Sequence, residues 1–152
     1  MSVFAWPARV YWEDTDGGGI VYYANYLRFL ERARTEWLRS LGYSQRALAE
    51  EQGVVFTVVS LEADYRRPAR LDDELTITCE PQAEGAASIR FAQRVYRSGS
   101  EPAPHRLLLE ASVRVACVDA RTLRPKRLPQ FLSHATVGRA PPRRHAARSQ
   151  VE

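Results

Sequence analysis

The residues best suited to chemistry in this sequence gather near its N-terminus. The acids Glu13, Asp14 and Asp16 stand just before three consecutive glycines, residues 17–19, and an amphipathic segment follows. A carboxylate can act as a nucleophile or general base, and N–H groups exposed where a glycine-rich turn meets a helix start can polarise a carbonyl oxygen. This pairing favours acyl transfer or hydrolysis. Acids before a helix also cap its N–H groups with no catalytic role, and that plainer interpretation stays open.

Other motifs do not fit this segment. A calcium-binding loop counted from Asp14 would need a bidentate Glu at its twelfth position, where Asn25 stands. The glycine run follows neither GxGxxG nor the Gly-Lys-Ser/Thr end of a phosphate-binding loop. There is no GxSxG motif, and the histidines lie in a loop and in the C-terminal region, so a Ser-His-Asp triad is not expected. Catalysis is therefore expected to rest on a carboxylate.

The two cysteines, Cys79 and Cys117, are predicted to be core residues. They form no CxxC pair and no cluster with histidines, so neither a metal site nor a disulfide framework is expected. Unpaired cysteines suit a reducing compartment, and we expect a soluble, cytoplasmic protein. Pro7 and Arg9 interrupt the apolar N-terminal stretch, which argues against a secretory leader, and no apolar run approaches the roughly 20 residues of a membrane span.

Charge divides the 152 residues into two unequal parts. The 22 basic and 18 acidic residues give a net +4, of which +3 lies in residues 138–152, where four arginines stand against one acid. Residues 1–137 carry the remaining +1 and are predicted to form one domain, and the Arg/Pro-rich residues 138–152 a disordered tail. The tail has no aromatic residues between its arginines, so its sequence is only a weak indication of polyanion binding, and no nucleic-acid partner is expected. The alternative is that the arginines of the tail bind nucleic acid or an anionic membrane.

The hydrophobic pattern predicts one long helix after the glycine turn. Residues 3–12 alternate as a strand, and Pro7 within them points to a sheet edge. Over residues 21–41 apolar side chains recur every three or four positions, which is the pattern of a helix covering an apolar core. Gly42 is the residue expected to end that helix.

A second, shorter helix and then a sheet are predicted beyond Gly42. Ser44 is the expected N-cap of a helix over residues 44–52, and Gly53 is expected to end it. Segments rich in β-branched residues predict strands over residues 54–65, 74–82, 87–97 and 106–119. Prolines limit regular structure after the last strand. The result is an α+β fold, one long helix against about five mostly antiparallel strands, whose uncovered face and edges favour self-association.

A long N-terminal motif, VYWEDTDGGGIVYYANYLRFLERARTEWL at residues 10–38, resembles the signature of hotdog-fold acyl-CoA thioesterases. The match is to the Tol-Pal-associated group and its 4-hydroxybenzoyl-CoA thioesterase relatives, and it covers almost all of residues 4–132. The resemblance implies a hotdog fold, in which a five-stranded sheet wraps one long central helix, and hydrolysis of acyl-CoA to free acid and CoA. It also implies a homodimer or homotetramer, no cofactor apart from the CoA of the substrate, and peripheral association with a membrane-linked complex.

Carried onto this chain, the resemblance makes Asp16 the catalytic nucleophile or general base. It makes Tyr23 the residue whose backbone N–H polarises the thioester carbonyl. Asp14 is expected to organise the turn, and Glu31 to form an ion pair with Arg34 or with a neighbouring strand. The residues expected to bind substrate are Trp12, Gly19, Ile20, Val21, Tyr22, Arg66, Arg67 and Arg90.

The chain also departs from the family pattern. Trp12 stands where many Tol-Pal-associated members have Tyr, and Tyr23 where they have His, so a mechanism through that His is not available, although the backbone amide at Tyr23 is kept. The aromatic pair is closer to the 4-hydroxybenzoyl-CoA branch, which leaves an aryl substrate open. Residues 84–87 lack the basic side chains with which relatives often meet the coenzyme phosphates, so the arginines named above are the remaining candidates.

A non-catalytic role is the alternative hypothesis. An acyl-thioester-binding or scaffold protein of an envelope complex would keep the same pocket and bind thioesters without turnover. Retention of Asp16 favours the enzyme, because a protein that only binds has no need of it. The acyl chain length and the choice between dimer and tetramer stay open.

Overall fold

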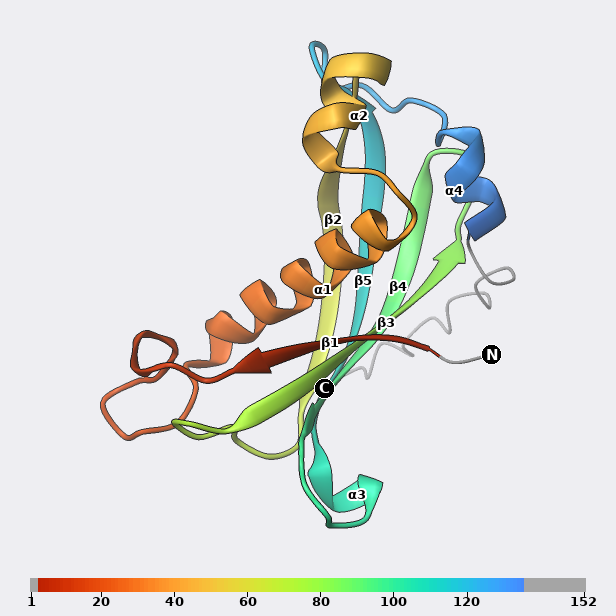
Figure 1. Cartoon of the computed structure of the whole chain (residues 1–152). Helices are drawn as coiled ribbons and strands as arrows, with labels where there is room; N and C mark the ends of the chain where they lie inside the picture. Colours follow the sequence, from red (N-terminus) through yellow and green to blue (C-terminus); the bar gives the residue numbers. More distant parts are fainter. Residues whose placement is uncertain (1–2, 136–152) are drawn as a thin grey trace, which may run out of the picture.

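Five strands form one antiparallel sheet in the computed structural model, which describes residues 3–135 (Figure 1). The strands are β1 Phe4–Arg9, β2 Val54–Tyr65, β3 Glu74–Ala83, β4 Ser88–Arg97 and β5 Leu107–Asp119. Their order across the sheet is β1-β3-β4-β5-β2, so β1 and β2 lie at its edges. The four strands predicted after the helices are confirmed to within one residue at each end. The predicted tail, residues 138–152, lies outside the described residues.

The first strand is shorter than predicted. It lies at a sheet edge, as Pro7 indicated. The strand prediction over residues 3–12 was wrong at its end, because the chain turns into a 3-10 helix at Trp12–Asp14. The Asp14 carboxylate holds that turn by accepting a hydrogen bond from the Tyr11 N–H at 2.8 Å. A local side-chain bond of this kind competes with strand pairing and leaves no trace in the alternation of apolar residues.

Helix α1, Tyr26–Ser40, lies across one face of the sheet (Figure 1). Its buried side chains are Tyr26, Phe29, Leu30, Ala33, Trp37 and Leu38. The predicted start at residue 21 was too early, because Tyr22 has extended backbone and Tyr23–Asn25 form a separate 3-10 turn. Gly42 follows the helix at φ +90°, a conformation that favours glycine, as predicted. In the described part of the chain no helix is long and apolar enough to cross a membrane.

Helix α2, Gln45–Gln52, begins and ends where the sequence predicted. The Ser44 hydroxyl accepts a hydrogen bond from the Ala47 N–H at 3.1 Å, which satisfies one of the free donors at the helix start. Gly53 adopts φ +64° and ends the helix. Both signals are local, which is why they could be read from the sequence.

Two short helices were not predicted: α3, Ala103–Arg106, and α4, Gln130–Ala135. The expectation that prolines limit regular structure after β5 therefore missed α4. Pro129 directly precedes α4, and the Leu132 N–H donates to its carbonyl at 3.0 Å. Leu132 is buried, and the ring of Phe131 stacks on Tyr43 with centroids 3.6 Å apart. Packing against distant parts of the chain thus orders a segment whose prolines suggested irregular structure.

The edge strand β2 contains a β-bulge. Its pairing with β5 shifts register between Val58 and Ser60, which leaves Val59 as an extra residue. As a result Val58 and Leu61, three positions apart, both line a cavity on the side of the sheet that carries α1. Val58, Val59 and Leu61 are 50%, 49% and 38% exposed, so this edge presents apolar surface.

Gly53→Ala is expected to lower the free energy of unfolding by about 1 kcal/mol, because alanine is strained in the left-handed conformation. A Cβ at this position would meet only the Lys126 ammonium, at 3.7 Å, so strain and not a clash supplies the cost. Urea unfolding measures the effect. The control Gly17→Ala has open space and no left-handed backbone and should unfold like wild type; equal losses in both variants would contradict the assignment.

Candidate active site

Asp14 joins the two ends of the glycine loop, residues 15–21. It is 4% exposed, and its Oδ2 accepts a hydrogen bond from the Tyr11 N–H at 2.8 Å. Its Oδ1 accepts one from the side-chain amide of Asn25 at 2.9 Å, and its carbonyl oxygen one from the Tyr22 N–H at 3.0 Å. The segment before the loop and the helix start after it are therefore held to one buried residue. This geometry fits the organising role expected of Asp14.

Asp16 lies exposed in the loop itself. Its N–H donates to the Ile20 carbonyl at 2.9 Å, and its Oδ1 accepts a hydrogen bond from the Gly18 N–H at 2.7 Å. Gly18 suits this turn because a Cβ there would come within 3.2 Å of that carboxylate oxygen. The Asp16 carboxylate is thus oriented by a backbone amide and stays accessible to an incoming molecule.

The first helical turn after the loop is fixed by two tyrosines. The Tyr65 hydroxyl donates to the Tyr23 carbonyl at 2.7 Å, and the Tyr26 hydroxyl accepts a hydrogen bond from the Ala69 N–H at 2.9 Å. The rings of Tyr26 and Tyr65 meet edge to face with centroids 5.5 Å apart. Burial raises the pKa of both hydroxyls, so both are protonated at neutral pH. The first N–H groups of a helix have no intrahelical acceptor, which leaves the Tyr23 N–H able to bind an outside oxygen.

A cavity of about 400 Å³ opens beside this turn. The predicted site residues that line it are Ile20, Val21, Tyr23, Arg66 and Arg67. Three further lining residues, Tyr26, Tyr65 and Pro68, were missed by the sequence reasoning. In the sequence, Tyr26 follows the same spacing as the other apolar residues of the helix, and Tyr65 is only the last residue of a predicted strand. No local pattern could have shown that these two rings meet.

The other predicted residues of the loop region do not line the cavity. Asp16 and Gly19 precede Ile20 in the loop, and Gly19 accepts a hydrogen bond from the Leu71 N–H at 3.2 Å. Trp12 and Tyr22 stand on the adjoining turns and are 81% and 48% exposed. Exposed aromatic residues of this size are typical of surfaces that bind another molecule.

The predicted substrate-binding arginines fall into two groups. Arg66 and Arg67 line the cavity; Arg66 pairs with Glu110 at 3.1 Å, and Arg67 donates to the Pro104 carbonyl at 2.9 Å. Both are exposed, so these contacts can exchange for others.

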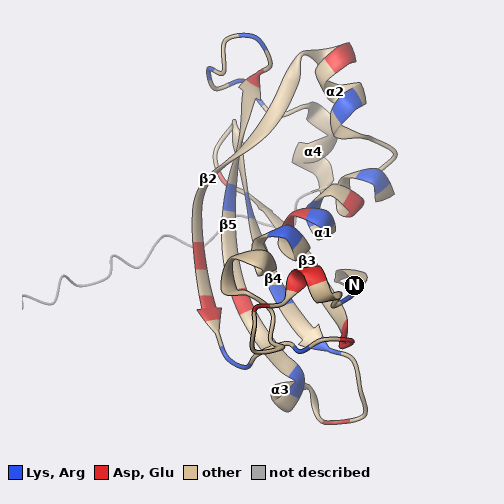
Figure 2. Ribbon diagram, turned by 90° about the vertical axis from the view of Figure 1, so that its left-hand side faces the viewer, with Lys and Arg blue, Asp and Glu red and all other residues tan. Residues whose placement is uncertain are grey.

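Arg90 is not brought to this cavity. Its neighbours in β4, Ile89 and Phe91, are buried, so its own side chain points to the opposite face of the sheet. There it pairs with Glu84 at 2.6 Å and donates to the Ser112 hydroxyl at 2.9 Å. Figure 2 shows basic and acidic residues together along these strands, so the sheet face there is mixed in charge.

Among the described residues, Glu31 forms an ion pair neither with Arg34 nor with a neighbouring strand, the two partners expected for it. The Arg34 guanidinium instead turns toward the sheet, where its NH1 donates to the Gln93 side-chain oxygen at 3.0 Å. Glu31 stays exposed on the helix surface. Because Arg34 points inward, its hydrogen-bond acceptor is the neutral, buried side chain of Gln93 and not the Glu31 carboxylate.

Both cysteines are buried and free, as predicted. Burial raises the pKa of Cys79 to about 12 and also raises that of Cys117, so neither thiol is a thiolate at neutral pH. Neither is therefore suited to be a nucleophile. Among residues 3–135, no group of three or more His, Cys, Asp or Glu side chains is placed to hold a metal ion.

Residues 10–136 match the sequence profile of the thioesterase-like superfamily. The chain belongs to this superfamily. Its relatives include the acyl-CoA thioesterase YbgC of Haemophilus influenzae, which is 46% identical over 132 residues, 87% of this chain and 93% of the relative. The YbgC protein of Helicobacter pylori is 32% identical over 126 residues, 81% of this chain and 92% of the relative.

Solved structures place this superfamily member in the hotdog fold, as the sequence resemblance implied. A probable thioesterase from Bartonella henselae is 36% identical with a TM-score of 0.72, covering 84% of this chain and 100% of that one. A 1,4-dihydroxy-2-naphthoyl-CoA thioesterase from Synechocystis superposes with a TM-score of 0.79 at 24% identity, over 88% of this chain and 95% of that one. At this identity, the similarity to the Synechocystis structure supports the fold alone.

Asp14→Ala is expected to destabilise the protein by about 1–3 kcal/mol, because it leaves the buried Asn25 amide and the Tyr11 N–H without their acceptor. Thermal unfolding followed by circular dichroism measures the change. The control Glu13→Ala removes a neighbouring exposed acid and should unfold close to wild type. Unchanged stability of Asp14→Ala would show that Asp14 does not hold the loop.

Proposed function

We propose that this protein hydrolyses acyl-CoA thioesters to the free acid and CoA. The observation that carries the proposal is the accessible Asp16 carboxylate in a loop that leads to a helix start and a cavity of about 400 Å³. The relatives named as acyl-CoA thioesterases support it, since they match this chain over most of its length. The substrate brings its own CoA, so no separate cofactor is proposed.

The chemistry divides between a carboxylate and a backbone amide. Asp16 either takes a proton from water, whose oxygen then attacks the thioester carbonyl, or attacks the carbonyl itself to give an anhydride that water opens. In both routes the Tyr23 N–H stabilises the negative charge that develops on the carbonyl oxygen. Collapse of the tetrahedral intermediate breaks the C–S bond and releases CoA as a thiolate, which needs no strong acid because thiolates leave readily. In the nucleophilic route this step forms the anhydride, and water opens it afterwards.

The two arginines of the cavity are the proposed contacts for the CoA phosphates. Arg66 and Arg67 lie on the connection between β2 and β3, directly beside Tyr65 and the helix start. Guanidinium groups bind phosphate oxygens with two parallel hydrogen bonds. Their present partners, Glu110 and a backbone carbonyl, are exposed contacts that a phosphate can replace.

A homodimer that joins two copies along β2 is the proposed assembly. β2 is a sheet edge, and its exposed apolar residues are those of the bulge region, Val58, Val59 and Leu61. An edge of this kind is normally covered, and a second copy supplies a matching edge. The reduced cysteines fit a cytoplasmic location, and peripheral association with a membrane-linked complex belongs to the same proposal.

Asp16→Asn is expected to lower kcat/KM by a factor on the order of a hundred or more, because the variant can neither accept a proton nor attack the carbonyl. Hydrolysis of short, long and aromatic acyl-CoA substrates, followed by thiol release, measures it. Glu13→Gln, an exposed acid of the same loop, is the matched control and should keep wild-type rates. Thioester binding without turnover by wild type would favour the scaffold role, and equal rates for wild type and Asp16→Asn would overturn the assignment.

Val59→Glu is expected to shift the protein from dimer to monomer, because it places a charge without a partner in the apolar edge that a second copy would cover. Sedimentation velocity over a range of concentrations measures the state. Leu123→Glu, at an exposed apolar residue outside the strands, is the control and should remain dimeric. A Val59→Glu protein that sediments like wild type would argue against assembly through this edge.

A further inference from the structure

Helix α1 covers only part of the sheet and leaves a trough beside β2. It packs mainly against β3 and β1, at the other side of the sheet. The space between α1 and β2 contains a cavity of about 240 Å³ lined by Leu27, Leu30, Arg34, Val58, Leu61 and Val113. All of these except Arg34 are apolar, so this part of the trough suits a hydrocarbon.

The candidate active site lies at the same end of α1 as Leu27, the first helix residue that lines the trough. The cavity beside the glycine loop is lined by Tyr23 and Tyr26 of the helix start and by Tyr65 of β2. The next cavity is lined by the following turns of α1 and by Leu61, four residues before Tyr65 in β2. The lining residues of the two cavities thus follow one another along α1, which gives an acyl chain whose carbonyl lies at the helix start a direction to continue in.

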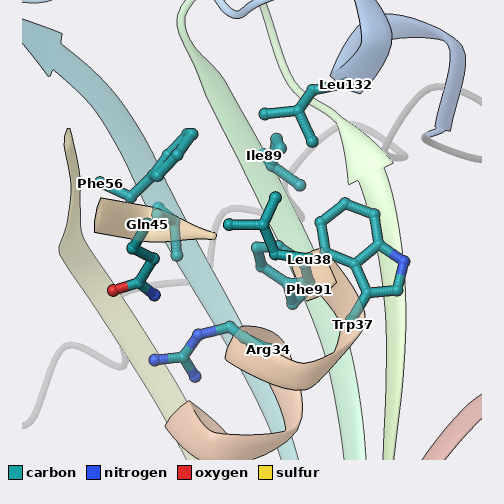
Figure 3. A pocket seen from close by; sticks show the side chains of 9 residues that line it. Arg34, Trp37, Leu38, Gln45, Phe56, Ile89, Phe91 and Leu132 are labelled. Atoms are coloured by element: carbon teal, nitrogen blue, oxygen red, sulfur yellow. The ribbon is translucent and has the colours of Figure 1, made fainter. Parts of the chain in front are cut away.

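A third, smaller cavity of about 50 Å³ lies beyond, near the end of α1 (Figure 3). Its lining is also largely apolar and includes Trp37, Leu38, Phe56 and Leu132. Arg34 lines this cavity as well as the one before it. The trough therefore consists of two apolar compartments with one guanidinium between them.

The Arg34 side chain is held firmly in this place. Its NH1 donates to the Gln93 side-chain oxygen at 3.0 Å, and Gln93 is 1% exposed. The Gln93 amide in turn donates to the Leu30 carbonyl at 3.0 Å and the Thr78 carbonyl at 3.3 Å. Burial lowers the pKa of Arg34, yet a guanidinium stays charged at neutral pH. Moving it aside would break a buried hydrogen bond and expose its charge to hydrocarbon.

We infer that Arg34 sets the upper limit of acyl chain length, an inference that rests on the proposed function. The acyl chain runs from the helix start past Leu27 and Leu61 and stops at the guanidinium. Each methylene before that point gains the free energy of leaving water, whereas a longer chain meets a fixed charge. The carbonyl lies at the level of Tyr23, eleven residues before Arg34, which is about 16 Å along a helix axis and allows a chain of about twelve carbons.

The test measures affinity against chain length in the full-length Asp16→Asn protein, whose turnover is expected to be slower by about a hundredfold or more. Saturated acyl-CoAs from butanoyl to octadecanoyl are titrated by calorimetry. Affinity is expected to rise about fourfold per methylene, equivalent to about 0.8 kcal/mol, and to level off between decanoyl and tetradecanoyl. A rise that continues through hexadecanoyl, a series without any rise, or no binding at any length would each overturn the inference.

Arg34→Met in the same background is expected to move the plateau to longer chains, because a flexible apolar side chain joins the two compartments. Arg28→Met removes an exposed arginine of the same helix and should leave the plateau in place. An unchanged plateau in Arg34→Met would assign the limit to another residue. If that variant does not fold, the series with Arg34 present still decides, since it must level off.

Turnover of the same series by the protein with Asp16 intact separates the two proposals. Binding that levels off as expected, with no hydrolysis at any chain length, would refute the proposed function and support the limit set by Arg34. Hydrolysis that continues undiminished through hexadecanoyl would support the function and refute the limit.

Discussion

The carboxylate of Asp14 accepts hydrogen bonds from the backbone before the glycine loop and from the helix start behind it. Everything proposed for the site depends on this arrangement, because it fixes the ends of a loop that would otherwise be free to move. With its ends held, a loop of glycines can orient Asp16 through a single amide contact. The glycines provide the conformations, but the buried acid beside them provides the position.

In the rest of the molecule, too, buried polar contacts hold the elements in place while an apolar surface stays open to binding. Gln93 satisfies three polar groups beneath α1 and ties helix and sheet together without an ion pair. A neutral bridge of this kind avoids the large cost of burying two opposite charges. The part of the sheet that α1 does not cover is left apolar and open, and this is where a substrate or a second copy can bury surface.

Signals carried by neighbouring residues made most of the fold predictable. Ser44 and Gly53 marked the ends of α2, and the order of strands and helix followed from periodicity alone. The family motif pointed to the loop residues, and the lack of basic side chains at residues 84–87 pointed to Arg66 and Arg67, which line the cavity. What could not be predicted depends on contacts between distant residues: the ring of Tyr65 against the helix start, the inward turn of Arg34, and the packing of Leu132 that orders α4.

The bulge in β2 shifts the alternation of its side chains by one residue. In a regular strand, residues an odd number apart point to opposite faces, yet Val58 and Leu61 share one face because Val59 is inserted between them. The inward-facing positions before and after Val59 thus differ by one residue in the sequence, and the residues on each side pair regularly with β5. Deleting Val59 would restore a regular alternation and leave both halves of the strand on their present faces, whereas pairing Val59 into the ladder would turn one half to the opposite face. The extra residue therefore changes the bend and twist of this edge strand without changing which side chains its neighbours present to the cavity.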